Sequence, residues 1–357
     1  MRKLLILSTA LTTVGFAASA EQVTVLSWGG AYGVSQVEAY NKPFTALTGI
    51  PTTMVDSDNP ATPIKAMVEA GNVTIDVADV ELSDAVRLCD EGMLEVIDHA
   101  ALPAGADGSS PMNDFVDGAL ASECAVASIV WSTVFAYDTT KASGVKSLAD
   151  FYDLAKYPGK RGLRKGAKAN LEMALMADGV PAAGIYDLLA TEAGIARAFA
   201  KLDTIKSDVV WWEAGAQPPQ LLADGEVAMT TAYNGRIFNA AAGEGQPFEI
   251  VWDGQIMEFD LFVIPKGTPN KDAAMKYVAF ATGTQPLADQ ARYISYGPAR
   301  KSSAPFVGKF KDDKTDMGPQ MPTAAVNLTN ALVSDFGFWA DHDTELSERF
   351  NSWLLSN

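Results

Sequence analysis

The chain has 357 residues and a net charge of −17, with 44 acidic residues against 27 lysines and arginines. This length fits about two domains, and the acidic balance argues against binding to nucleic acid or to anionic membranes. Only two histidines are present, His99 and His342, which leaves little for a zinc site or a His-based catalytic relay.

The N-terminus has the pattern of a secretory signal. Arg2 and Lys3 precede a short apolar run at residues 4–17, and Ala18 and Ala20 form an A-x-A cleavage site. The run is shorter than the ~20 residues that span a bilayer, and no lipobox cysteine suggests a lipid anchor. We therefore predict a signal peptide at residues 1–20, cleaved near Glu21, and a periplasmic mature protein with a charge of about −19.

The first third of the chain alternates strands and helices. Strands are predicted at 23–27, 51–55 and 73–80, and helices at 34–48, 63–70 and 84–91. This order favours a parallel sheet with helices on both faces. Ligands bind at the carboxyl ends of such strands, and Trp28, Tyr32 and Glu81 follow directly after predicted strands.

Two later segments are predicted to cross between lobes. Residues 126–137 form an apolar run that is long for a strand of one sheet, and residues 256–265 are the second candidate. Between them we expect helices at 147–154, 170–178, 183–189 and 191–202, and strands at 208–212 and 226–232. Helices are expected beyond them at 270–281, 284–293, 323–334 and 343–354.

These crossings predict an α/β fold with two discontinuous lobes, each a mostly parallel sheet flanked by helices. The first lobe would comprise residues 21–132 and 258–300, and the second residues 133–257 and 301–357. A cleft between lobes with strands as hinges suits closure around a ligand.

Cys89 and Cys124 are the two cysteines of the chain. An even count in an oxidising compartment favours one disulfide, although two buried thiols are the alternative.

Enzyme signatures are absent from the sequence. It contains no nucleophile elbow, Walker A loop, HExxH, GxGxxG or EF-hand loop. We therefore predict neither a cofactor nor a bound metal, and no enzymatic activity. A periplasmic hydrolase remains an alternative because carboxylate pairs form only in space, and a metal-binding relative is another.

Several phrases, in order, resemble the polyamine-binding periplasmic proteins of ABC importers, within the broader extracellular solute-binding family. They include Trp28 to Tyr32, IDVA at 75–78, GEV at 225–227, YNG at 233–235 and FDLFVIP at 259–265. The resemblance implies a two-lobed, type II-like periplasmic-binding-protein fold. It also implies a small amine ligand, such as putrescine or spermidine, and delivery to an inner-membrane ABC permease. We expect a monomer.

The resemblance also implies roles for single residues. Aromatic walls would come from Trp28, Tyr32, Tyr233 and Tyr296, because ring faces attract cations. Asp260 would pair with the ammonium group, since a buried ammonium needs a partner. Glu81 would be a further anion. The adjacent tryptophans of 211–212 point to opposite faces of a strand, so Trp212 is a second-rank wall candidate and Glu213 a second-rank acid.

The chain departs from the family pattern at two basic positions. Arg164, Lys165 and Lys168 stand where the family has acidic residues, and Arg236 stands where some members have Asp. An arginine would repel a diamine but bind a carboxylate through two parallel hydrogen bonds. The alternative ligand is therefore a zwitterionic amine-carboxylate or a betaine-like compound.

Overall fold

The structure is a computed structural model that describes residues 21–356. The predicted signal peptide at residues 1–20 lies outside this range. Within it, no helix combines the length and the apolar character needed to cross a membrane.

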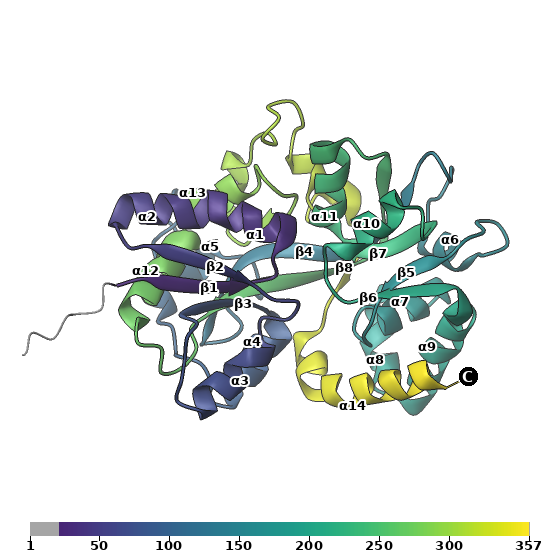
Figure 1. Cartoon of the computed structure of the whole chain (residues 1–357), viewed down its shortest axis with the longest axis horizontal. Helices are drawn as coiled ribbons and strands as arrows, with labels where there is room; N and C mark the ends of the chain where they lie inside the picture. The colour runs from purple at the N-terminus through teal and green to yellow at the C-terminus, as the bar shows by residue number, and fades with distance from the viewer. Residues whose placement is uncertain (1–20, 357) are drawn as a thin grey trace, which may run out of the picture.

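The first half of the fold contains the alternating elements that the N-terminal sequence predicts (Figure 1). Strand β1 (Val23–Ser27) lies between β2 (Thr52–Asp56) and β3 (Val77–Glu81), and both pairings are parallel. The helices are α1 (Gly30–Gln36), α2 (Lys42–Thr48), α3 (Thr62–Glu69), α4 (Leu82–Asp90) and the short α5 (Pro111–Asp114). A π-helical turn at Val37–Asn41 joins α1 to α2.

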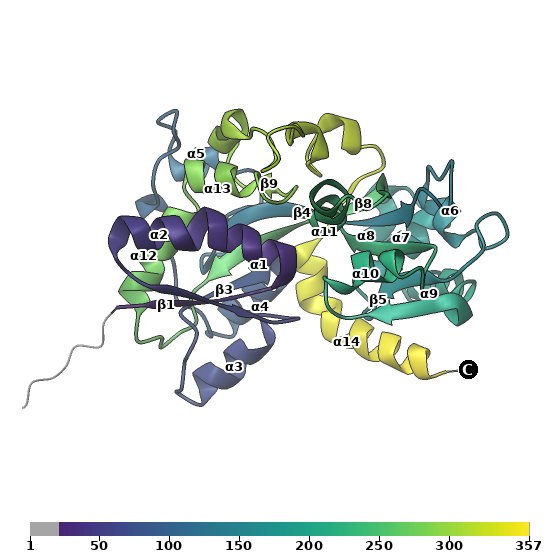
Figure 2. The same cartoon turned by 45° about the horizontal axis from the view of Figure 1, so that its top comes forward.

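Two long strands connect the halves of the molecule (Figures 1 and 2). They are β4 (Ala125–Asp138) and β8 (Phe248–Val263), which pair antiparallel along most of their length. The chain leaves along β4 and returns along the neighbouring β8, so the centre of the sheet is antiparallel rather than parallel. The strand order is β2-β1-β3-β8-β4-β7-β5-β6. The exact lobe boundaries given above stay a prediction.

The second half continues the sheet with β7 (Met229–Tyr233), β5 (Arg161–Arg164) and β6 (Val209–Trp212). Its helices are α6 (Leu148–Tyr152), α7 (Asn170–Ala177), α8 (Ile185–Leu189), α9 (Glu192–Asp203), α10 (Gln217–Ala223) and α11 (Asn234–Phe238). Three of these elements, β5, α10 and α11, lie outside the elements predicted from the sequence. Strand β5 reads RGLR and has no β-branched run, but its pairing with β6 and β7 holds it in the sheet.

The C-terminal third contains α12 (Lys271–Ala281), α13 (Thr284–Gln290), β9 (Gly297–Pro298), β10 (Leu332–Val333) and α14 (Phe336–Leu355). The helix predicted at 323–334 is wrong, because this segment holds a single 3-10 turn and then β10, which pairs with β8. Helix α14 begins earlier than predicted because Asp335 accepts a hydrogen bond from the Phe338 N–H at 3.0 Å and caps it.

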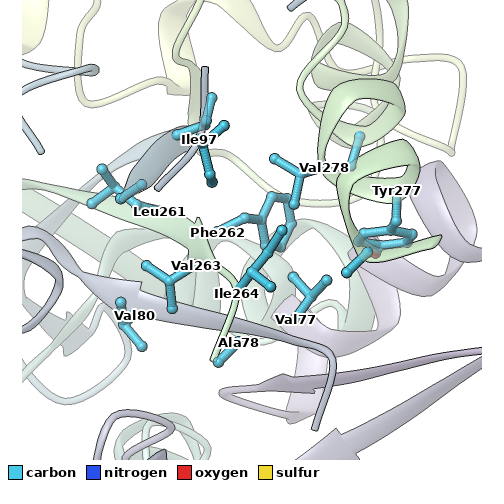
Figure 3. Packing of buried hydrophobic residues seen from close by; sticks show 14 of the residues in the cluster. Val77, Ala78, Val80, Ile97, Leu261, Phe262, Val263, Ile264, Tyr277 and Val278 are labelled. Carbon is cyan, nitrogen blue, oxygen red and sulfur yellow. The ribbon is translucent and has the colours of Figure 1, made fainter. Parts of the chain in front are cut away.

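Separate hydrophobic cores support the two halves. In the first, the inward side chains of β3 and of the end of β8 pack against α12 (Figure 3). Phe262 is fully buried there, with its ring 5.8 Å from that of Tyr277. In the second, Trp339 and Phe350 of α14 are buried against the α7 and α9 layer. Each half therefore has its own interior, and the crossing strands join them.

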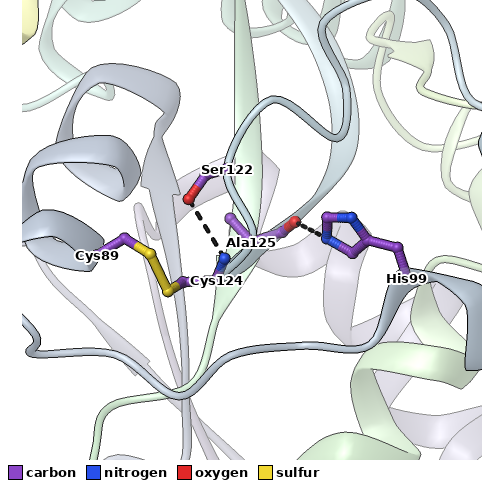
Figure 4. Close-up of a disulfide and its surroundings, with 5 residues drawn as sticks. All are labelled: Cys89, His99, Ser122, Cys124 and Ala125. Carbon is purple, nitrogen blue, oxygen red and sulfur yellow. Dashed lines mark hydrogen bonds between the residues drawn. A yellow bond between two sulfur atoms is a disulfide. The ribbon is translucent and has the colours of Figure 1, made fainter.

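A disulfide joins Cys89 of α4 to Cys124, the residue before β4 (Figure 4). The two Cα atoms are 5.8 Å apart. Beside it, the His99 ring is 2.9 Å from the carbonyl oxygen of Ala125. The bridge thus ties the first helical layer to the start of a crossing strand.

Candidate ligand-binding site

A small pocket lies where both halves meet the crossing strands. Its lining comes from strand ends, from segments beside them and from within the crossing strands: Trp28, Tyr32, Glu81, Trp131, Tyr233, Arg236, Asp260 and Tyr296. Trp28 follows β1, Glu81 ends β3 and Tyr233 ends β7. The carboxyl ends of neighbouring parallel strands meet at one edge of a sheet, which explains why residues far apart in sequence converge here.

Aromatic side chains form most of the pocket wall. The rings of Tyr32 and Tyr296 meet edge to face with centroids 5.3 Å apart, and those of Trp131 and Tyr233 do so at 4.8 Å. Such edge contacts fix ring orientation. The arrangement offers ring faces and edges to a small aliphatic ligand.

Asp260 supplies a carboxylate to the pocket. Its Oδ1 accepts a hydrogen bond from Trp131 Nε1 at 2.8 Å, and within residues 21–356 it makes no salt bridge. Burial raises the pKa of Asp260 well above its usual range, and the charges of Asp79 and Glu81 raise it further. A cation placed beside Asp260 would relieve this unfavourable burial.

Arg236 supplies a guanidinium to the same pocket. Its Nη1 donates to the Gly29 carbonyl at 2.7 Å and its Nη2 to the Trp28 carbonyl at 3.2 Å, and no described carboxylate forms a salt bridge with it. Arg236 Nε and Trp28 Nε1 are buried and have no hydrogen-bond partner in the described structure. These free donors suit a carboxylate.

Gly30 explains the glycine pair of the WGGAY segment. Its φ of 56° is left-handed, and a Cβ there would clash with Arg236 Nη1. Glycine is therefore required for the guanidinium to reach the backbone of this turn.

Asp79 supports the pocket from behind, and the sequence analysis missed it. It is fully buried on β3, and its Oδ2 accepts hydrogen bonds from Tyr32 Oη at 2.7 Å and from Gln36 Nε2. Burial raises the pKa of Asp79 to about 7. An acid inside the strand VADVE was the available signal, because buried carboxylates need partners.

Glu81 lines the pocket but is already paired. Its Oε2 lies 2.8 Å from Lys168 Nζ and its Oε1 lies 3.4 Å from Arg164 Nη1. Burial alone would raise the pKa of Glu81, but the charges of Lys168 and Arg164 outweigh burial and lower it to about 2. Glu81 is therefore an ionised group whose charge the protein itself neutralises.

Two of the predicted site residues do not line the pocket. Trp212 is buried behind the wall, with its ring 5.5 Å from that of Tyr233. The Glu213 side chain is 67% exposed and pairs with Lys165 at 3.0 Å on the surface. Both residues lie outside the pocket because β6 is at the edge of the sheet, away from the crossing strands. Trp131, which the sequence analysis did not place in the site, is part of the wall instead.

Metal-ligating side chains gather at one place in the described range, at Cys89, Glu123 and Cys124. Both sulfur atoms there are in the disulfide. The pocket lining contains two carboxylates, a guanidinium and three tyrosines, and none of its residues is a histidine or a cysteine.

A buried pocket between two α/β halves joined by long strands defines a two-lobed binding protein for a small solute. Comparison with known proteins agrees: residues 39–323 match the family "Bacterial extracellular solute-binding protein", and the chain belongs to this family. The protein is a non-enzymatic, solute-binding component of an ABC transporter.

Individual relatives extend this finding. The chain is 45% identical to the gamma-aminobutyric acid-binding protein of Pseudomonas aeruginosa over 96% of its own length and 95% of that protein. It is 35% identical to a GABA receptor of known structure, with a TM-score of 0.79 and coverage of 94% and 98%. A binding protein of A. tumefaciens B6, solved with glucopine, is 29% identical, with a TM-score of 0.84 and coverage of 94% and 100%. These structures confirm the predicted two-lobed α/β fold.

Proposed function

We propose that the protein captures a zwitterionic amine-carboxylate, with 4-aminobutyrate as the best candidate, in the periplasm and delivers it to an ABC permease. One observation carries this proposal. Asp260 and Arg236, of opposite charge, line the same pocket, and neither forms a salt bridge within residues 21–356. A ligand with an ammonium group and a carboxylate would supply both missing partners.

The alternatives fit the same pocket less well. A polyamine needs an anion at each end, but Glu81 is already paired with Lys168 and Arg164, and Arg236 would repel an ammonium group. A betaine would satisfy Arg236 but has no N–H to donate to Asp260. The relative that binds gamma-aminobutyric acid supports the same choice.

Calorimetry on the mature protein tests the proposal. We expect 4-aminobutyrate to bind at least tenfold more tightly than putrescine or glycine betaine, a difference of about 1.4 kcal/mol or more. Tighter binding of putrescine than of 4-aminobutyrate would overturn the proposal and restore the polyamine prediction. Arg236→Gln is expected to weaken the binding of 4-aminobutyrate more than that of putrescine, because only 4-aminobutyrate has a carboxylate.

A further inference from the structure

Two acids and two bases form a buried cluster at one side of the ligand pocket. Lys168, which follows β5, lies between Glu81 of β3 and Glu258 of β8 and forms a salt bridge with both. Its Nζ also lies 3.3 Å from Ser83 Oγ. The side chains of Lys168 and Glu81 are only 12% and 8% exposed. This burial distinguishes the cluster from an exposed salt bridge on the surface, whose charges solvent would screen.

Glu81 connects the cluster to the ligand pocket. Glu81 and Asp260 are direct partners across the antiparallel β3–β8 pair, and both line the pocket. Side chains of directly opposed residues lie close together. Without Lys168, Glu81 would keep only its longer contact of 3.4 Å with Arg164. The pocket would then present a second, weakly paired carboxylate beside Asp260, which is better suited to a second ammonium group.

The present arrangement leaves one carboxylate for the ligand. Both oxygens of Glu81 face basic groups, Oε2 towards Lys168 and Oε1 towards Arg164. Within the described residues, the carboxylate of Asp260 accepts one hydrogen bond, from the neutral Trp131 N–H. Together with Arg236, the pocket thus offers one anionic and one cationic contact.

We propose that Lys168 is a specificity-determining residue, which pairs with Glu81 and so denies a second anionic contact to diamines. This inference rests on the proposed function of the pocket. It gives a role to the basic segment at 164–168. Lys168 does not need to touch the ligand, because it acts by neutralising a carboxylate of the pocket wall.

Lys168 also bridges the two halves of the molecule. Its loss could therefore weaken the binding of every ligand by favouring an open cleft. The informative quantity is therefore the ratio of the dissociation constants for putrescine and 4-aminobutyrate. A purely structural role would change both constants by the same factor and leave their ratio unchanged.

The test compares this ratio by calorimetry in the mature protein and in Lys168→Met. We expect the variant to shift the ratio at least tenfold towards putrescine. Adding Glu81→Gln to Lys168→Met removes the uncovered carboxylate and should return the ratio to within about threefold of the unsubstituted protein. Lys168→Arg keeps the charge and should keep the ratio. Lys168→Gln serves if the Met variant does not fold.

Lys165→Met is the matched control, because Lys165 belongs to the same basic segment but its side chain is 46% exposed and pairs with Glu213 on the surface. The ratio of the two dissociation constants should not change in Lys165→Met. An unchanged ratio in the Lys168 variants, or a shift that persists after Glu81→Gln, would overturn the inference. A preference of the unsubstituted protein for putrescine would instead overturn the proposed function, so the two failures are distinguishable.

Discussion

At the scale of single residues, Asp260 and Arg236 are two buried charges that the described protein leaves without an ion-pair partner. Burying such groups is unfavourable unless they are paired. Their aromatic surroundings lower the local dielectric, and this strengthens the attraction between each of these groups and a ligand charge beside it. Under the proposed function, a zwitterionic ligand would supply both missing partners.

Asp260→Asn should weaken binding of 4-aminobutyrate by roughly 1.5–3 kcal/mol, the usual size of a hydrogen bond to a charged group. The amide oxygen can still accept from Trp131, so the wall should persist. Calorimetry measures the change, and Glu213→Gln, which alters an exposed acid outside the pocket, is the control. Unchanged affinity in Asp260→Asn would remove Asp260 from the site.

Binding should also depend on pH. The pKa of Asp260 is raised, chiefly by burial, so part of the free protein carries a proton on this carboxyl that an ammonium ligand must displace. The affinity for 4-aminobutyrate should therefore rise with pH above the ordinary titration range of an aspartate, by up to roughly tenfold per unit for one linked proton. Calorimetry across this range checks the direction.

A second carboxyl contributes to the same range, since the pKa of Asp79 is raised to about 7. Asp260→Asn should flatten most of the pH dependence, and Asp79→Asn a smaller part of it, because Asp79 contacts Tyr32 rather than the pocket. Affinity that falls as pH rises would contradict the assignment of Asp260 as the ammonium partner.

At the scale of elements, the crossing strands β4 and β8 fix the site. Trp131 and Asp260 lie on these two strands, and Glu81 lies on the strand paired with β8. The apolar run at 126–137 predicted β4, because a run with so many β-branched residues is typical of a strand that is buried on both faces. These three residues of the pocket lining are therefore held by the sheet, whereas Trp28 and Tyr296 lie in loops.

The disulfide is an element-scale device for stability. Replacing Cys89 and Cys124 by Ala opens a loop of 35 residues, which should lower the free energy of unfolding by about 3–4 kcal/mol in the chain-entropy model. Urea denaturation measures this loss. Ligand affinity should change less than twofold, because Cys89 lies at the far end of α4 from Glu81. A stability change below about 1 kcal/mol would contradict the prediction.

Some elements could not be predicted from local sequence. The 323–334 segment contains good helix formers, yet its Leu332 and Val333 pair with Ile256 and Met257 of β8. Strand β5 likewise exists because β6 and β7 lie beside it. Tertiary pairing overrides propensity in both cases, and Trp212 was misplaced because the edge position of β6 is a property of the whole sheet.

At the scale of the whole molecule, a ligand that binds only the folded protein must stabilise it. At a ligand concentration of 100 times the dissociation constant, the gain is about 2.7 kcal/mol. The melting temperature should then rise by roughly 4 °C for a chain of this size. A thermal-shift assay with 4-aminobutyrate measures this rise, with Asp260→Asn as the control that should lose most of it. No shift with 4-aminobutyrate would contradict its binding.

The sequence by itself determined the fold class, because hydrophobic periodicity and turn residues act locally. The resemblance of its ordered phrases to the extracellular solute-binding family supplied the family and most of the residues that line the pocket. It left the ligand open between a polyamine and a zwitterion. Only the tertiary structure showed that Glu81 is paired with Lys168 and Arg164 while Asp260 and Arg236 are not. The reason is physical: the charge that a pocket offers depends on which side chains meet in space, and Arg236 and Gly29, which meet here, are 207 residues apart in the chain.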